Sequence, residues 1–210
     1  MAGNQRVLEQ SDTIILALRP DHAAKALGRL AFRADHRVIS LMAGLDHKTV
    51  SRMIIPARFE AVMLAFPNIA KQGSPILVHG QTGLIKALFG ARNSIFKVEN
   101  TAGFDAYLCA QAVLSPAVLL VQGAAKWLGA RIEDQKQGEQ FLRALVGSNL
   151  SSGQCAPLLE ALNTTGGYNQ RLREHMVRQG ISAALTEGLD GLETGRSSQP
   201  PLLTPDGFAR

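Results

Sequence analysis

An uninterrupted apolar run at residues 14–18 constrains the fold of this chain more than any other feature. Asp12 precedes the run and Pro20 ends it. Apolar runs without alternation are typical of strands buried on both faces, as in a parallel sheet covered by helices. A helical pattern follows at residues 20–30, and a second apolar run at residues 37–44. This order predicts a parallel strand–helix–strand unit.

The carboxyl ends of these two predicted strands are where a parallel α/β sheet binds its ligands. Residues 17–20 and 42–44 would lie there. No G-x-G-x-x-G turn precedes them, and the opening MAGNQRVLEQSD leaves no room for an earlier strand and such a turn. The sequence therefore predicts a ligand-binding edge without the usual phosphate loop.

The two halves of the chain differ in their patterns. Further strands are predicted at 59–65, 74–78 and 94–98, with helices at 46–53 and 81–89. Beyond residue 101 only helical patterns remain, and the first is an apolar helix at 104–129 that we expect to kink at Pro116. Strands followed only by helices indicate two domains, α/β and then all-α.

Composition excludes several classes of function. The chain is 46% hydrophobic and 19% charged with a net charge of +5, but its charges are scattered and aromatic residues make up only 5%. We therefore expect no nucleic-acid partner. The apolar segment around 104–129 is interrupted by polar residues and Pro116, which favours a helix buried in a dimer or bundle core over a membrane span. The histidines share no spacing, so no metal site is expected, and the predicted location is the cytoplasm.

Three motifs follow one another between residues 4 and 193. The first comprises Asn4, Ser-Asp at 11–12 and Ala-Leu-Arg-Pro at 17–20; the second comprises Ser-Leu-Met-Ala-Gly at 40–44 and Phe-Pro-Asn at 66–68. The third is Thr-Thr-Gly-Gly-Tyr-Asn at 164–169. In this order they resemble the pyrroline-5-carboxylate reductase family, enzymes of proline biosynthesis that reduce a cyclic imine to proline.

The resemblance implies a truncated Rossmann-like parallel-sheet domain at residues 1–100 and a helical dimerisation domain at 101–195. A tail at 196–210, rich in Pro and Ser, is expected to be disordered. The implied function is that of an NAD(P)H-dependent oxidoreductase with NADP as cofactor, a small-molecule imine or amino acid as ligand, and a homodimer formed through the C-terminal helices. NADP binding is expected to be weak, because no glycine-rich loop holds the pyrophosphate.

The resemblance also implies site residues. Those expected to approach the nucleotide are Asn4, Ala17, Leu18, Arg19, Pro20, Met42, Ala43 and Asn68. Those expected to border the substrate are Glu99, Thr164, Thr165, Gly166, Gly167 and Tyr168, with Asn169 as the candidate catalytic residue. Simpler interpretations stay open: Arg19 and Glu99 as exposed charges after strands, and Thr164 and Thr165 as caps of a helix.

One departure from the family concerns the substrate loop. Its P-G-G-T-T pattern is T-G-G-Y-N here, so an amide at Asn169 replaces a threonine hydroxyl and the bulkier Tyr168 would shrink the pocket. The chain is therefore either a fragment of a longer reductase or a lineage that has lost the chemistry. The rival function is that of a non-catalytic dimeric binding or scaffold protein built on the same fold.

Overall fold

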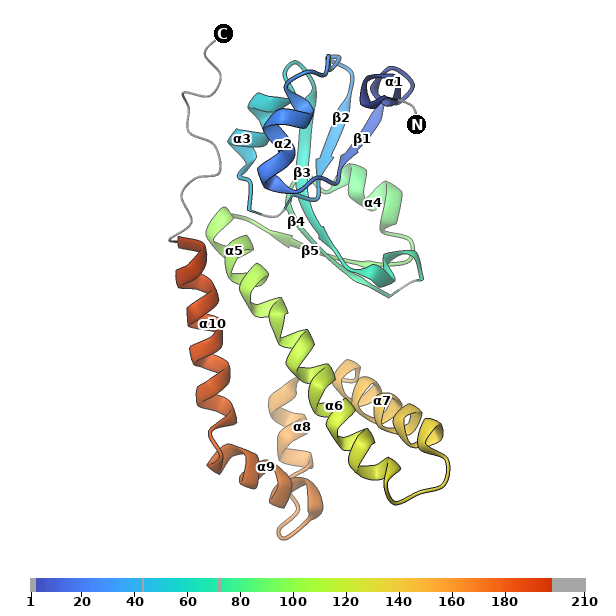
Figure 1. Cartoon of the computed structure of the whole chain (residues 1–210), viewed down its shortest axis with the longest axis vertical. Coiled ribbons are helices and arrows are strands. Elements are labelled where there is room, and N and C mark those ends of the chain that lie inside the picture. The colour runs from blue at the N-terminus through green and yellow to red at the C-terminus, as the bar shows by residue number, and fades with distance from the viewer. Residues whose placement is uncertain (1–2, 43, 72, 198–210) are drawn as a thin grey trace. The chain divides into compact units, whose positions relative to one another are not determined.

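The computed structural model describes residues 3–42, 44–71 and 73–197. They form two compact units, one running to Leu108 and including the end of the last helix from Gly195, the other comprising Cys109–Thr194 (Figure 1). Ala43 and residues 198–210, which hold most of the predicted tail, lie outside the described residues.

The first unit is an α/β layer structure. Its elements are α1 (Asn4–Glu9), β1 (Thr13–Leu16), α2 (Pro20–Leu27), β2 (Arg37–Ser40), α3 (His47–Met53), β3 (Arg58–Ala65), the 3-10 helix η1 (Pro67–Ala70), β4 (Pro75–Gly80), α4 (Gly83–Phe89), β5 (Ser94–Val98) and the start of α5 (Thr101–Ala110). The five strands form one sheet in the order β1-β2-β3-β4-β5. β1, β2 and β3 are parallel, β4 is antiparallel to β3, and β5 is parallel to β4. The predicted α/β sheet followed by helices is confirmed.

Helices cover both faces of the sheet, with α2 and α3 on one side and α4 on the other (Figure 1). Alternate residues of each strand enter different cores. The core on the first face is formed by Leu8, Ile14, Leu16, Ala23, Leu27, Val38 and Val50, among others. The core beneath α4 is formed by Ile39, Ala61, Met63, Ile76, Val78, Leu84 and Ile85.

The prediction that the first strand is buried on both faces is wrong. Ile14 and Leu16 are buried, but the side chain between them, Ile15, is 43% exposed. β1 is an edge strand, and the core beneath α4 contains no residue of β1. α4 therefore covers the middle of its face and leaves Ile15 open.

The short helix α1 was not predicted. Arg33 stabilises the position of α1. Its Nη1 donates to Leu8 O at 3.0 Å, and its Nη2 forms an ion pair with the Asp12 carboxylate at 3.1 Å. The buried His36 ring places Nε2 3.1 Å from the same Leu8 carbonyl. These contacts join residues more than twenty positions apart, so no local pattern reveals them.

A buried carboxylate lies where β2 and β3 begin. Glu60 is 2% exposed, and its Oε1 accepts from Arg37 Nε at 2.7 Å and lies 3.3 Å from Arg58 Nε. The hydrogen bond to Glu60 raises the pKa of Arg37 above its ordinary value. The register of β2 against β3 shifts here, with Ile39 opposite Ala61. The two arginines thus satisfy a carboxylate that would be costly to bury alone.

The second unit is entirely helical. Its elements are the rest of α5, the 3-10 turn η2 (Gln111–Val113), α6 (Leu114–Gly129), α7 (Gln135–Ser151), α8 (Cys155–Ala161), α9 (Tyr168–Arg178) and α10 (Ile181–Ser197) up to Thr194. The α-helical pattern breaks at η2, one turn before Pro116. Pro116 has no N–H to donate to the carbonyl four residues earlier, which accounts for the break.

The first turns of α5 belong to the sheet unit. Phe104 and Leu108 are buried against Val62, Leu77 and Val98. The division between the two compact units therefore falls inside α5, after Leu108.

One helical segment among the described residues, Thr101–Gly129, is long and apolar enough to cross a membrane. Only 11% of its most apolar window is buried within the chain. Length and composition do not distinguish a membrane span from a helix that another subunit covers, so they are weak evidence for a span.

Gly80 provides a test of the packing around Glu60. Its φ is +125°, and a Cβ there would lie 2.6 Å from the Glu60 carbonyl oxygen. Gly80→Ala should therefore lower the free energy of unfolding by about 1–3 kcal/mol, measured by urea titration. The control is Gly83→Ala at the start of α4, where a Cβ meets nothing within 4 Å. Equal stability of the two variants would contradict this account of the turn.

Candidate functional site

Most of the predicted nucleotide-binding residues lie along one edge of the sheet. Leu16 is paired with Ser40, so β1 and β2 end level with each other. Leu41 N extends the pairing by donating to Leu16 O at 2.8 Å. The residues that follow these two strand ends are Ala17, Leu18, Arg19, Pro20 and Met42. β3 runs on three residues past Val62, the partner of Ser40, and Asn68 lies beyond its end in η1.

The segment after β2 is held by hydrogen bonds of its own. Met42 is 1% exposed, and its N–H donates to Ser40 Oγ at 3.1 Å. The Asp46 carboxylate caps α3, accepting from Thr49 N at 2.8 Å and from Thr49 Oγ1 at 2.9 Å. The Met42 side chain belongs to the core, so this segment can offer a ligand backbone groups but not that side chain.

Arg19 already has an anionic partner. Its Nε and Nη2 donate to the two oxygens of Asp21 at 3.2 and 3.1 Å. Asp21 also places an acid in the first turn of α2, and Pro20 at the first helical position has no N–H. Pro20 thus removes one N–H donor from the start of α2, and the Asp21 carboxylate offsets part of the positive helix dipole, so this helix start is less favourable for phosphate than other helix N-termini.

The predicted substrate loop lies in the helical unit. α9 begins at Tyr168, and its cap residue Gly167 has no side-chain partner. Gly166 adopts a φ of +73°, and its N–H donates to Gln170 Oε1 at 2.7 Å. The hypothesis that Thr164 and Thr165 cap this helix is therefore wrong; the loop is held by the Gln170 amide and by a Gly167 N to Thr164 O bond of 2.9 Å.

This loop presents donors to solvent. The first N–H groups of α9, at Tyr168 and Asn169, have no acceptor within the helix. The Asn169 side chain is exposed, and the Tyr168 ring is 90% exposed. The Tyr168 ring therefore makes few contacts within the described part of this unit. A carboxylate at this helix start would be favoured by the helix dipole.

Glu99 follows the end of β5. The strand pairing places Leu16, Ser40, Val62, His79 and Val98 in one row across the sheet. β5 therefore ends level with the ends of β1 and β2, with β3 and β4 between them. The Glu99 carboxylate accepts from Lys97 Nζ at 2.8 Å.

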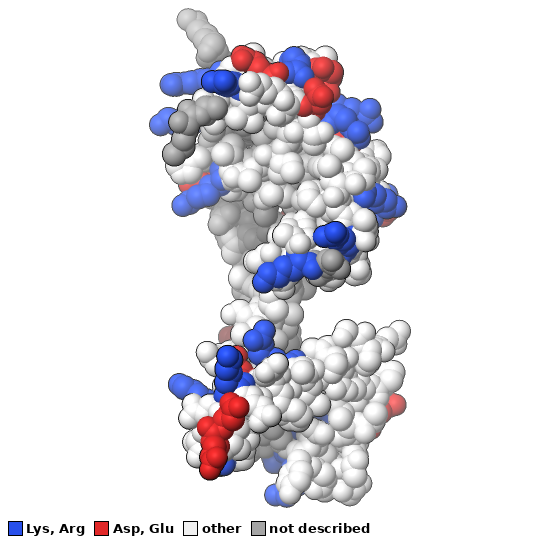
Figure 2. All heavy atoms as spheres, turned by 90° about the vertical axis from the view of Figure 1, so that its right-hand side faces the viewer, with Lys and Arg blue, Asp and Glu red and all other residues white. Residues whose placement is uncertain are grey.

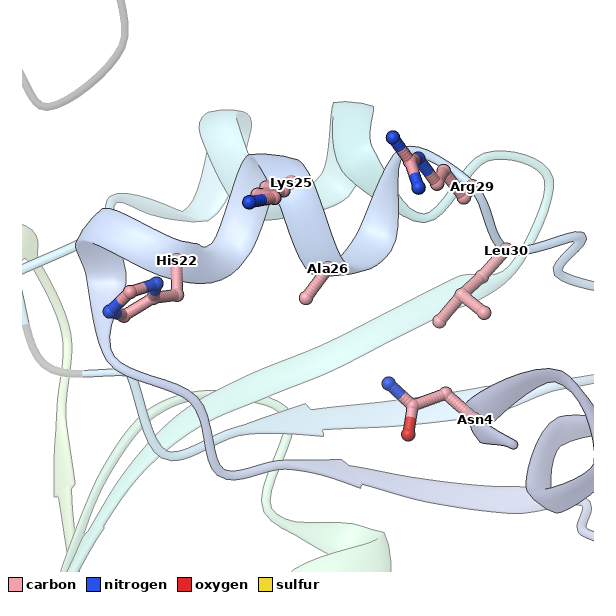
Figure 3. A pocket seen from close by; sticks show the side chains of 6 residues that line it. All are labelled: Asn4, His22, Lys25, Ala26, Arg29 and Leu30. Carbon is pink, nitrogen blue, oxygen red and sulfur yellow. The ribbon is translucent and has the colours of Figure 1, made fainter. Parts of the chain in front are cut away.

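Asn4 lines a cavity of about 560 Å³ together with His22, Lys25, Ala26, Arg29 and Leu30 (Figure 3). It lies beside α2, across the pocket from His22 in the first turn of that helix. The sequence reasoning did not single out the basic residues of this pocket, of which His22 and Lys25 lie on α2 and Arg29 lies just beyond its end. Among the described residues no group of three His, Cys, Asp or Glu side chains could hold a metal ion.

Comparison with known proteins supplies the fold. No protein-family model matches the sequence, and no curated protein sequence matches it. Solved structures do. 1-Pyrroline-5-carboxylate reductase from Streptococcus pyogenes is similar to this chain, with a TM-score of 0.77 and 16% identity. The similarity covers 93% of this chain and 79% of the reductase.

Two further structures agree. Pyrroline carboxylate reductase from Plasmodium falciparum with NADP bound has a TM-score of 0.80 at 10% identity, over 94% of this chain and 80% of that one. The pyrroline-5-carboxylate reductase from Coxiella burnetii has a TM-score of 0.73 at 12% identity, over 94% and 79%. The chain therefore has the fold of the pyrroline-5-carboxylate reductases.

Substitution of Asp46, the N-cap of α3, measures how much the hydrogen bonds of the segment after β2 contribute to the free energy of unfolding. Partial burial raises the pKa of Asp46, but the hydrogen bonds from Thr49 and the nearby Arg52 charge outweigh it, so the pKa lies below its ordinary value. Asp46→Ala should lower the free energy of unfolding at neutral pH by about 1 kcal/mol. Because the folded-state pKa is depressed, this carboxylate stabilises the fold above pH about 4, and the gain is lost as the pH falls through the folded-state value.

Asp46→Asn is the matched control. The amide can still accept from Thr49 N but carries no charge, so it should retain most of the stability at neutral pH and lose the acid dependence of this cap. Urea titrations of the three proteins between pH 3 and 7, roughly the range in which an aspartate titrates, compare them. Parallel pH profiles for all three would contradict the assignment.

Proposed function

We propose that this chain is an NAD(P)H-dependent oxidoreductase of the pyrroline-5-carboxylate reductase type, reducing a cyclic imine acid to proline or a proline-like product in the cytoplasm. The observation that carries the proposal is the similarity of fold to three such reductases over 93–94% of the chain. The order of the three sequence motifs supports it independently, because it does not depend on overall identity.

Hydride transfer to an imine requires few catalytic side chains, so the residues at the proposed site are compatible with it. A bound nicotinamide supplies the hydride, and the protein orients the reactants and offers donors to the substrate. In this proposal the strand ends at Ala17, Leu18, Met42 and Asn68 support the dinucleotide. The loop from Thr164 to Asn169 receives the carboxylate through the backbone N–H groups of α9 and the Asn169 amide.

The residues fit the dinucleotide only in part. The described strand ends offer a common edge, but Arg19 is paired with Asp21 and no G-x-G-x-x-G turn occurs in the 210 residues. Hydrogen bonds to charged groups contribute about 1.5–3 kcal/mol each. At about 1.4 kcal/mol per tenfold, the loss of two would weaken a micromolar cofactor to the millimolar range.

The alternative is a non-catalytic dimeric binding or scaffold protein with this fold. The Arg19–Asp21 ion pair favours it, because this arginine already has an anionic partner. The two proposals share a fold and differ in whether the bound dinucleotide is oxidised, so turnover separates them.

Titration calorimetry of the full chain with NADPH, followed by imine-dependent NADPH oxidation, tests the proposal. We expect a dissociation constant in the millimolar range and slow turnover. Asn169→Ala should lower kcat/KM about tenfold, since it removes one hydrogen bond to an anionic group. Gln179→Ala, at the opposite end of α9, is the control and should leave kcat/KM unchanged. Detectable NADPH binding without imine-dependent oxidation would favour the scaffold, and micromolar binding would contradict the predicted weakness.

We also propose that the chain forms a homodimer through its helical unit. Large apolar side chains exposed on α6 and α7 include Val118, Leu119, Trp127, Phe141, Leu145 and Leu150. Figure 2 shows charged side chains of this unit gathered on one side of the visible face, with uncharged surface over much of the rest. Monomers rarely expose apolar surface on this scale. A second copy covering the same surface is the simplest symmetric arrangement.

Sedimentation at micromolar concentration tests the dimer. Leu119 is 65% exposed on α6, so Leu119→Glu should shift the chain toward monomer by placing a charge in the interface. Lys126→Glu on the same helix is the control, because that position already carries an exposed charge. A stable monomer for the unaltered chain would overturn the proposal.

A further inference from the structure

The two outer strands of the sheet, β1 and β5, form its lateral edges (Figure 1). On the inner side of β1, the chain at β2 donates hydrogen bonds to Asp12 O and to Leu16 O, each at 2.8 Å. Alternate residues of a strand direct their N–H and C=O groups to the same side. Thr13 and Ile15 therefore direct theirs away from β2, toward the open lateral edge.

The outward backbone groups of β1 are unpaired. In residues 3–42, 44–71 and 73–197, no strand or loop forms a hydrogen bond with Thr13 or Ile15 from that side. The Ile15 side chain is 43% exposed on the α4 side of the sheet, where the core contains no residue of β1. From Thr13 to Leu18 the sequence has no charged residue. The β1 edge is thus apolar and offers main-chain donors and acceptors.

The β5 edge, in contrast, carries a charge. Ser94 N donates to Ser74 O at 3.1 Å, so by the same alternation Ile95 and Lys97 direct their backbone groups outward. The Lys97 side chain is exposed, and its ammonium group forms a 2.8 Å ion pair with Glu99. Charged side chains on an edge strand hinder the addition of a further strand. β1 lacks this protection.

We propose that β1 binds an extended segment of another polypeptide, which adds one strand to the five-stranded sheet. The backbone groups of Thr13 and Ile15 would pair with the main chain of that segment, and an apolar side chain of the segment would cover Ile15. Main-chain pairing supplies most of the affinity, so an extended form and β-branched side chains define the partner. This inference does not rest on the proposed reductase function.

The size of the β1 edge favours a short segment over a second copy of the chain. β1 has four residues, which corresponds to about 13 Å of strand. A stable protein interface buries about 1,200–2,000 Å², and two strands of this length provide only a small part of that area. A second copy would also bring its own α1 and α2 to the side of the sheet on which α1 already packs through Leu8.

The test uses the full chain and the synthetic peptide Lys-Thr-Val-Thr-Val-Thr-Val-Lys, labelled with a fluorophore and titrated by fluorescence polarisation. We expect the peptide to bind and to slow the amide hydrogen exchange of Thr13 and Ile15, because these N–H groups gain a partner. Ile15→Pro removes one outward N–H and no hydrogen bond to β2, so it should weaken peptide binding by at least about tenfold.

Two further variants complete the test. Ile15→Lys keeps the N–H and places on β1 the kind of charge that β5 carries, so it should also weaken binding by at least about tenfold. Lys97→Pro is the matched control, because it removes an outward N–H from the other lateral edge and should leave peptide affinity unchanged. If circular dichroism shows that Ile15→Pro does not fold, the comparison of Ile15→Lys with Lys97→Pro decides.

Absence of peptide binding, equal weakening by the Ile15 variants and Lys97→Pro, or unchanged hydrogen exchange at Ile15 in the bound chain would overturn the proposal. Exchange at Ile15 that slows as the concentration of the chain alone is raised would assign the β1 edge to a second copy, and would also overturn it. Peptide binding at β1 by a chain that does not oxidise NADPH would uphold this inference while the proposed reductase function fails.

Discussion

The reversal of chain direction between β3 and β4 organises the sheet unit. Because β1 and β2 are parallel and end level with each other, the segments after them begin at one edge. β4 and β5 run the other way, but Leu16, Ser40, Val62, His79 and Val98 lie in one row across the sheet, so β5 ends at the same level. β3 and β4 continue beyond this row to the pair Ala65 and Ile76. Topology thus brings Glu99, just after β5, to the level at which the segments after β1 and β2 begin.

The two units differ in how much of their apolar surface they bury within the chain. The sheet unit has cores on both faces, closed by α1, α2 and α3 on one side and α4 on the other. In the helical unit, which is described throughout, the buried residues are Cys109, Gly129 and Gly138, all of them small. The large side chains of Leu119 and Trp127 are 65% and 62% exposed. A surface of this kind is stable in water only when something covers it. The homodimer proposal follows from this imbalance between the units.

Sequence patterns predicted what local spacing determines. The strands, the helices after residue 100 and the break near Pro116 follow from apolar periodicity and from the missing N–H of proline. Contacts between distant residues were missed: α1 depends on Arg33 and His36, and Ile15 is exposed because α4 lies too far along the sheet to cover it. The pocket beside α2 was missed for a related reason, because Asn4 and the residues of α2 that line it are distant in the sequence.

This chain shares the fold of the three reductases at only 10–16% sequence identity. At such divergence, cofactor affinity and the alignment of cofactor with substrate need not change to the same extent. Aligning a nicotinamide with an imine depends on backbone positions that the sheet edge fixes, and many side chains can provide them. Holding a pyrophosphate depends on several donors aimed at one place, and each lost donor costs about tenfold in affinity. Cofactor affinity is therefore more fragile than the geometry of hydride transfer.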